Sequence, residues 1–137
     1  MAESLQVLLA ELERFGEAND NATAERPRRM LNITHDTGEF LSVLVQATSA
    51  QRVLEIGTSN GYSTLWLASA AGAMGGTVTT VELSDYKVGL ALQNFSRSGL
   101  ASSITLVQDD AGRVLERAGD ASFDLVFLDA ERPEYHG

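Results

Sequence analysis

Cysteine is absent from this sequence, and basic residues are scarce. Without cysteine, the chain forms no disulfide and offers no thiolate ligand to a metal. The 10 Lys and Arg residues stand against 19 Asp and Glu residues, which gives a formal net charge of −9. A surface of this charge repels a phosphate backbone, so we expect no nucleic-acid partner. One basic cluster (Arg26, Arg28 and Arg29) departs from the trend, and its composition favours a solvated linker over a lip above an anionic ligand.

Long hydrophobic runs and a signal sequence are also missing. No apolar stretch approaches the roughly 20 residues that a membrane-spanning helix needs. The N-terminus lacks the basic start and small-residue cleavage site of a signal peptide, and its leucines recur at helical spacing. We therefore expect a cytoplasmic protein with no membrane partner. With 137 residues, 44% of them hydrophobic, the chain has the length of one domain with its own core.

Short apolar runs alternate with helical stretches in the sequence after Arg52. Four runs are apolar throughout, as strands buried on both faces should be: residues 53–56, 77–83, 104–107 and 123–128. Helices are predicted between them at residues 61–71, 85–98 and 111–118. This alternation predicts an α/β fold with a parallel sheet and right-handed crossovers.

Two further helices are predicted before the first strand. Residues 3–15 carry leucines at helical spacing, and the polar residues 16–30 read as a connection. The second helix covers residues 36–47, and its predicted buried stripe consists of Phe40, Leu41, Leu44 and Val45.

Acidic residues and a glycine-rich turn follow the predicted strands. They are Glu55 with the turn 57–63, then Glu82, then Asp109 and Asp110, and last Asp129. Each has a purely structural interpretation, since glycines permit a tight turn and Asp110 can cap the next helix. The carboxyl ends of parallel strands, however, form the ligand-binding edge of an open sheet. Together these residues indicate a ligand site at that edge.

The composition of the turn discriminates between nucleotide-like ligands. An acid about 20 residues past a glycine turn suits ribose hydroxyls, in dinucleotides and adenosyl ligands alike. Dinucleotide sites favour G-x-G-x-x-G, but Ser59 stands at the middle glycine and no Lys or Arg lies nearby to balance phosphates. The GK[ST] signature of a P-loop is missing as well. An acidic edge fits a phosphate-free nucleoside with a cationic sulfonium better, and S-adenosylmethionine is such a ligand.

Several segments resemble one family of enzymes. RVLEIGTSNGYSTLWLA (52–68) closely resembles the first motif of small S-adenosylmethionine-dependent O-methyltransferases related to the catechol and caffeoyl-CoA enzymes. The next three motifs are matched in order by TVTTVEL (77–83), ITLVQDDAGRVL (104–115) and FDLVFLDAERPEY (123–135). Upstream, LNITHDTGEFL (31–41) resembles the segment that the family folds over its cofactor. The resemblance implies a Rossmann-like class I methyltransferase sheet, in strand order 3-2-1-4, with helices on both faces.

The resemblance also implies roles for residues around the methionine tail of the cofactor. Gly57, Ser59 and Gly61 would line the tail. Glu55 would support the turn, and Ser63 would hydrogen-bond the carboxylate of the tail.

Other roles concern the nucleoside and a metal. Glu82 would hold the ribose, Asp110 and Ala111 would flank the adenine, and Ile33 would contribute from the upstream segment. Asp129 would lie by the methionine amine and, in metal-dependent members, would be the first ligand of a divalent cation such as Mg²⁺ or Ca²⁺.

Two features depart from the family pattern. Metal-dependent members often place a lysine base where Arg132 stands, and arginine stays protonated in proteins, so no catalytic residue is assigned. The family also continues through three more strands, which carry the Asp-Asn pair of the metal site. We therefore expect a fragment, with an N-terminal helix and connection (1–30) and an incomplete cofactor-binding domain (31–137). Its fourth strand would be an open apolar edge, which predicts a homo-oligomer.

The function implied by the family is methyl transfer from S-adenosylmethionine to a hydroxyl of a small molecule. For this chain we expect cofactor binding without turnover. Two alternatives remain open, a dinucleotide-binding domain and a non-catalytic interaction module with the same fold.

Overall fold

A computed structural model of the chain describes residues 2–22, 33–117 and 123–128. Its elements in chain order are α1 (Ala2–Ala22), α2 (His35–Thr48), β1 (Arg52–Ile56), α3 (Tyr62–Ala73), β2 (Thr77–Glu82), α4 (Asp85–Ser98), the 3₁₀ turn η2 (Ala101–Ser103), β3 (Ile104–Gln108), α5 (Ala111–Arg117) and β4 (Leu125–Leu128). The basic cluster at 26–29, Asp129 and Arg132 lie outside the described residues. None of the helices described is both long and apolar enough to cross a membrane.

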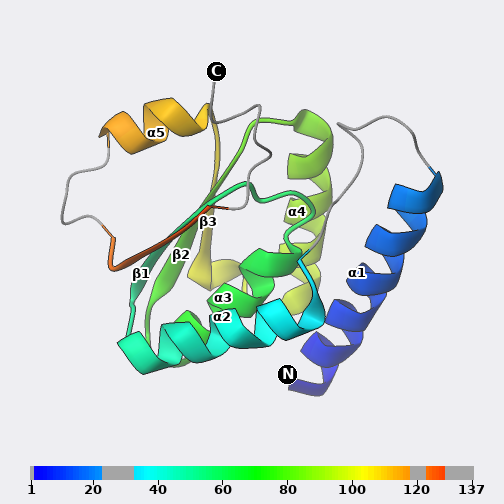
Figure 1. Ribbon diagram of the computed structural model, residues 1–137, viewed down its shortest axis with the longest axis horizontal. Coiled ribbons are helices and arrows are strands. Elements are labelled where there is room, and N and C mark those ends of the chain that lie inside the picture. Colours follow the sequence, from blue (N-terminus) through cyan, green and yellow to red (C-terminus); the bar gives the residue numbers. More distant parts are fainter. Residues whose placement is uncertain (1, 23–32, 118–122, 129–137) are drawn as a thin grey trace.

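The strands form one parallel sheet in the order β3-β2-β1-β4, as predicted (Figure 1). Val53 of β1 pairs with Val78 of β2 on one side and with Leu125 of β4 on the other. The central strands β1 and β2 are buried over most of their length, but β3 and β4 are only half-buried. The expectation that all four are buried on both faces is therefore wrong, because β3 and β4 are edge strands of the described sheet.

Helices cover both faces of the sheet, as predicted, but unequally. The connections from β1 to β2 and from β2 to β3 run in the same direction across the sheet, so right-handed crossovers place α3 and α4 on one face. The connection from β3 to β4 runs back and places α5 on the other face (Figure 1). The α5 face is the less covered of the two, since Val126 and Leu128 on β4 are about half exposed.

The helix α3 is the centre of the core. Most of its side chains are buried, which is typical of a helix that is apolar all round. One cluster joins it to α2 and the sheet through Leu41, Val45 and Val53. A second cluster joins it to α1 and α4, with Leu9 and Phe95 as members. Thus α1 packs on α3 and α4, outside the layer that covers the sheet (Figure 1).

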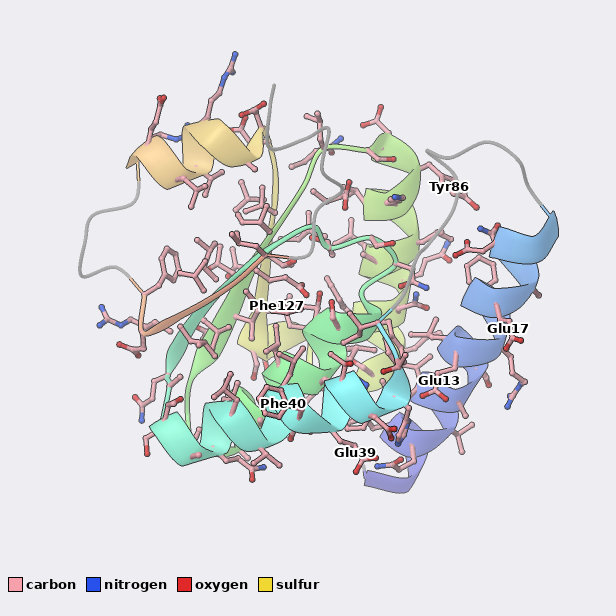
Figure 2. The ribbon with its side chains drawn as sticks, viewed as in Figure 1. Glu13, Glu17, Glu39, Phe40, Tyr86 and Phe127 are labelled. Atoms are coloured by element: carbon pink, nitrogen blue, oxygen red, sulfur yellow. The ribbon has the colours of Figure 1, made fainter. Side chains whose placement is uncertain are left out.

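Two predictions about the first helices are wrong. Residues 16–22, expected to belong to the connection, continue α1. The reason is that Leu9, Leu12 and Gly16 lie at helical spacing and are all buried, so the packed face extends beyond Phe15. In α2, Phe40, which is labelled in Figure 2, is 62% exposed instead of buried. The packed face of α2 consists of Gly38, Leu41 and Val45, and at Gly38 the bare backbone lies against the indole of Trp66.

The close approach of α2 to α3 predicts opposite effects for two glycine substitutions in helices. A Cβ atom at Gly38 would lie 2.3 Å from Nε1 of Trp66, so Gly38→Ala should destabilise the fold by about 1–3 kcal/mol. A Cβ atom at Gly89 in α4 would meet nothing within 4 Å. Gly89→Ala should therefore stabilise the fold by about 0.5–1 kcal/mol, because alanine is the better helix former. Urea unfolding followed by circular dichroism measures both effects. If the urea midpoints of both variants shift in the same direction, the close packing of Gly38 against Trp66 is contradicted.

Candidate functional site

The turn between β1 and α3 has a left-handed backbone at three positions. Gly57, Ser59 and Gly61 have φ angles of 98°, 53° and 92°. Glycine adopts such angles at little cost, whereas Ser59 does so as a side-chain-bearing residue. The turn is held to β2, because the N–H groups of Gly57 and Thr58 both donate to the carbonyl of Val81, at 2.9 and 3.2 Å.

Glu82, the last residue of β2, fixes the middle of this turn. Its Oε1 accepts a hydrogen bond of 2.8 Å from the backbone N–H of Ser59. Its Oε2 accepts from the N–H groups of Leu83 and Ser84, at 3.2 and 3.1 Å. The side chain is nearly buried, and these donors satisfy part of its hydrogen-bonding capacity. The bond to Glu82 also explains how Ser59 is kept in its left-handed conformation.

Glu55 lies beneath the turn, fully buried between the sheet and α3. Ser63 and Thr64 in the first turn of α3 both donate their hydroxyl protons to its carboxylate. Thr80 on β2 donates to Oε1 at 2.8 Å. Since Thr80 gives its proton to Glu55, the 2.6 Å contact between the Thr58 and Thr80 hydroxyls has Thr58 as donor. A carboxylate at a helix N-terminus is also stabilised by the helix dipole.

A cleft of about 180 Å³ opens where β1, β2 and β3 end. It is lined by Ile56, Gly57, Val81, Glu82, Leu83, Asp109, Asp110 and Ala111. The carboxylates of Glu82, Asp109 and Asp110 form one part of the lining, and aliphatic side chains form the other part. No basic side chain is among these lining residues. Such a lining suits a flat apolar ring that carries hydroxyl and amine donors.

The two aspartates of the cleft are fixed by local bonds. The backbone N–H of Asp110 and the guanidinium of Arg117 lower the pKa of Asp109, so it is ionised near neutral pH. Asp110 Oδ1 accepts from the N–H of Arg113 at 3.2 Å, which caps α5. The predicted cap is therefore present, and it leaves the second oxygen of Asp110 available to a ligand.

The structure separates the residues predicted for the site into groups. Those that line the cleft together are Gly57, Glu82, Asp110 and Ala111. Glu55 and Ser63 lie buried below the turn, and Ile33 packs between the helix clusters. Gly61 packs against α4, since a Cβ atom there would lie 2.6 Å from Cε1 of Phe95. Asp129 lies outside the described residues.

Sequence reasoning missed several residues around the site. Leu83 lines the cleft, and Thr64 and Thr80 complete the network of Glu55. Thr80 gave no distinct signal, because Thr77 and Thr79 lie in the same strand. Glu13 and Tyr62, which bond to each other at 2.6 Å, gave none, because they are 49 residues apart.

Comparison with known proteins decides the family. A family model described as O-methyltransferase matches residues 4–137. The chain belongs to the O-methyltransferase family. The catechol O-methyltransferase of Mycobacterium tuberculosis is 40% identical over 109 residues, which are 80% of this chain and 48% of that protein. The catechol O-methyltransferase of Niastella koreensis is 33% identical over 121 residues, 86% of this chain and 54% of that protein. The chain thus spans about half the length of the curated relatives it matches.

Solved O-methyltransferases share the fold of this family member. The enzyme of Bacillus cereus, in complex with S-adenosylhomocysteine (SAH), has a TM-score of 0.73 and 32% identity, and the match covers 95% of this chain and 58% of that one. TomG of Streptomyces achromogenes, in complex with S-adenosylmethionine, has a TM-score of 0.72 and 29% identity, with 97% and 56% covered. The Rossmann-like methyltransferase sheet and the resemblance to catechol O-methyltransferases are therefore confirmed.

The network under the turn predicts a large effect of Glu55→Gln. The variant keeps the shape but replaces one acceptor by an NH₂ group that faces hydroxyl donors. We expect a loss of stability of about 1.5–3 kcal/mol, the usual worth of a hydrogen bond to a charged group. The matched control is Glu116→Gln on the exposed side of α5, which should change stability by less than about 0.5 kcal/mol. Equal urea midpoints for both variants would show that the carboxylate at position 55 is not needed.

Proposed function

We propose that the chain binds S-adenosylmethionine in the cleft at the ends of β1, β2 and β3, as the cofactor-binding half of an O-methyltransferase. The observation that carries the proposal is the position of the Glu82 carboxylate, at the cleft and bonded to the glycine turn. Two of the similar solved enzymes hold SAH or S-adenosylmethionine, which supports the same ligand here.

The lining of the cleft fits the nucleoside part of this cofactor. Glu82 can accept from both ribose hydroxyls, as acidic residues at this strand end do in nucleoside sites. The aliphatic side chains of Leu83 and Ala111 suit the faces of the adenine, and Asp110 can accept from its exocyclic amine. A dinucleotide fits less well, because the residues that line the cleft include no cation to balance its phosphates.

The methionine tail would lie along the glycine turn, at the start of α3. The Ser63 hydroxyl donates to Glu55, so it is not free to donate to the carboxylate of the cofactor. We therefore assign that contact to the backbone N–H groups of Ser63 and Thr64 in the first turn of α3, which have no acceptor within the helix, because the N–H of Tyr62 donates to Asn60 Oδ1. Gly57 and Ser59 would line the tail, whereas Gly61 would act by letting the turn approach Phe95.

When bound, the cofactor supplies an electrophilic methyl group on a sulfonium. The residues of this chain bind it and orient it, and orientation of two reactants is a large part of catalysis in such transfers. The methyl acceptor we propose for the whole protein is a hydroxyl of a small molecule, in line with the catechol O-methyltransferases it resembles. No residue of the chain is assigned a proton transfer.

Two further parts of the proposal concern a cation and self-association. A divalent cation would use Asp129 as its first ligand, and within the described segments no group of three or more His, Asp or Glu side chains could hold a metal. A homo-oligomer would use the edge strand β4, where Val126 and Leu128 are 48% and 53% exposed.

Self-association predicts a concentration-dependent mass in sedimentation. The double variant Val126→Lys, Leu128→Lys adds charge to the exposed face of β4 and should shift the chain towards the monomer. A wild-type chain that stays monomeric at high concentration contradicts the proposed oligomer. This result does not bear on the proposed cofactor site.

Calorimetric titration with SAH tests the proposed function. We expect one site per chain and no binding of NADH. Glu82→Gln should weaken SAH by about ten- to a hundredfold, because it removes a charged acceptor of hydroxyl donors. Asp85→Asn is the matched control, since it removes a nearby charge that does not line the cleft.

Three results contradict the proposal in different ways. If the chain binds NADH tightly and does not bind SAH, it is a dinucleotide-binding domain. A folded chain that binds neither ligand would favour an interaction module with this fold. If Glu82→Gln binds SAH with unchanged affinity, the Glu82 carboxylate does not hold the ribose.

A further inference from the structure

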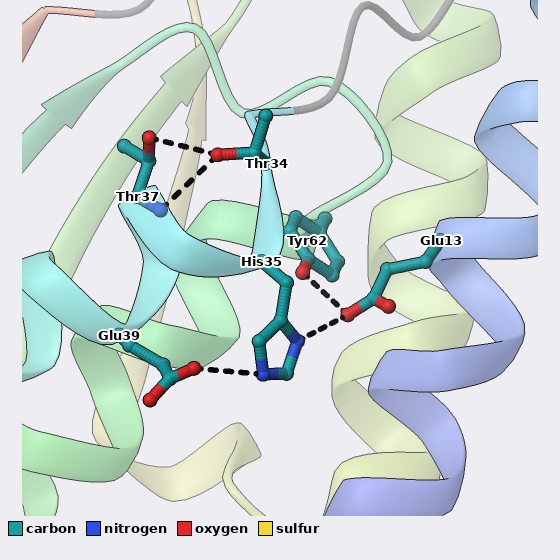
Figure 3. A network of polar contacts seen from close by, with 6 residues as sticks. All are labelled: Glu13, Thr34, His35, Thr37, Glu39 and Tyr62. Atoms are coloured by element: carbon teal, nitrogen blue, oxygen red, sulfur yellow. Dashed lines mark hydrogen bonds and ion pairs between the residues drawn. The ribbon is translucent and has the colours of Figure 1, made fainter.

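His35, the first residue of α2, lies between carboxylates from two helices. Its Nδ1 is 2.8 Å from Oε2 of Glu13 on α1, and its Nε2 is 3.1 Å from Oε1 of Glu39 on α2 (Figure 3). A neutral imidazole has one N–H donor and one acceptor nitrogen. The hydrogen bond to Glu13 needs a proton on Nδ1, and the two carboxylates at these distances favour the charged imidazolium over the neutral ring.

Glu13 joins this contact to the segment that carries the glycine turn. The hydroxyl of Tyr62 donates to the same Oε2 of Glu13, at 2.6 Å (Figure 3). Tyr62 is buried and follows Gly61 directly, as the first residue of α3. Glu13 therefore holds the beginnings of α2 and α3 to one point on α1. We call Glu13, His35, Glu39 and Tyr62 the latch.

The surroundings of His35 favour its positive charge. The acidic groups near it come from α1 and from α2 itself: Glu13, Glu17, Asp20, Asp36 and Glu39. On the α3 side its ring makes an edge-on contact with Trp66, with 5.1 Å between the ring centroids. Tyr62 donates to the same carboxylate of Glu13, and the positive charge of Arg14 also acts on that carboxylate.

The pKa values of the latch residues shift in consistent directions. The hydrogen bond to Glu13 raises the pKa of His35 above its ordinary value of 6.5, against a smaller effect of burial. Burial opposes ionisation of Glu13, but the bonds from Tyr62 and His35 outweigh it and lower its pKa below 4.5. Burial, helped by the bond to Glu13, raises the pKa of Tyr62 far above its usual range, so it stays a donor.

We propose that the latch is a proton-dependent device: protonated His35 fastens α1 to the starts of α2 and α3, and loss of the proton loosens α1 and weakens ligand binding at the glycine turn. The effect on the ligand rests on the proposed function, whereas the fastening of α1 does not. In this device Glu13 is a positioning residue that acts on the turn through Tyr62.

The direction of the pH dependence follows from the two shifts. A raised pKa in His35 gives stability that is complete below about pH 6.5 and is lost as pH rises through the folded-state value. A lowered pKa in Glu13 gives stability that is complete above about pH 4.5 and is lost at lower pH. The latch is thus fully closed between these limits and opens as the pH rises above about 6.5.

The first experiment follows the latch without any ligand. Trp66 is the only tryptophan of the sequence and touches His35, and a protonated imidazole quenches indole fluorescence. Emission should therefore rise with pH, with a midpoint above 6.5. The same transition should appear in His136→Gln, which removes the other histidine, and should be missing in His35→Gln. A transition that survives in His35→Gln overturns the proposal.

The second experiment measures SAH affinity at pH 6.0 and pH 8.5. The wild-type chain should bind on the order of two- to fivefold more weakly at the higher pH, the range expected for partly exposed ion pairs. His35→Gln should bind weakly at both values. His35→Arg keeps a charge that does not titrate in this range, so its affinity should no longer depend on pH.

A control variant separates the latch from a general loosening of α1. Glu11 pairs with Arg97 and ties α1 to α4 without a histidine. Glu11→Gln should lower stability at both pH values and leave the pH dependence of SAH binding as in the wild type. If His35→Gln or His35→Arg keeps the wild-type pH dependence, the latch is not its source and the proposal fails. If no variant binds SAH at all, the proposed function fails, and the Trp66 titration alone decides on the latch.

Discussion

A buried carboxylate holds the centre of this structure in place. Glu55 is fully buried, and a charge in such surroundings is stable only if it is well hydrogen-bonded. Its donors come from α3 and β2, so the strand that carries Glu55 is tied to the next strand and to the helix between them. This fixes both ends of the turn from Gly57 to Gly61. The left-handed backbone at Gly57, Ser59 and Gly61 then connects the fixed strand to the fixed helix.

The candidate ligand site and the outer helix both depend on that arrangement. Above the turn, Glu82 binds the N–H of Ser59 and faces the cleft, so the turn lies between two carboxylates of neighbouring strands. At the start of α3, Ser63 points inward to Glu55 while the adjacent Tyr62 reaches outward to Glu13 on α1. One turn of helix thus connects the buried network, the cleft and the N-terminal helix. A change in how α1 is held can therefore act on the turn.

Local signals in the sequence determined much of this architecture. The helix α4 begins and ends as predicted, since Ser84 accepts from the N–H of Lys87 and Gly99 adopts a left-handed conformation. Asp110 caps α5 for the same reason, namely that a cap depends on residues three positions apart. The alternation of short strands with helices predicted the parallel direction of the strands, whereas their order was implied by the family resemblance. Glu82, Asp110 and the glycine turn meet at one edge because parallel strands end on the same side.

Only the tertiary structure decided features that join distant parts of the chain. Phe40 is exposed and α1 extends past Gly16, because burial depends on which face meets α3 and not on hydrophobicity alone. Gly61 is needed for the approach of Phe95, 34 positions away, as well as for its backbone angle. The bond between Glu13 and Tyr62 has no local signal in either segment. Sequence patterns report on neighbours within a few turns, whereas these contacts exist only once the helices have packed.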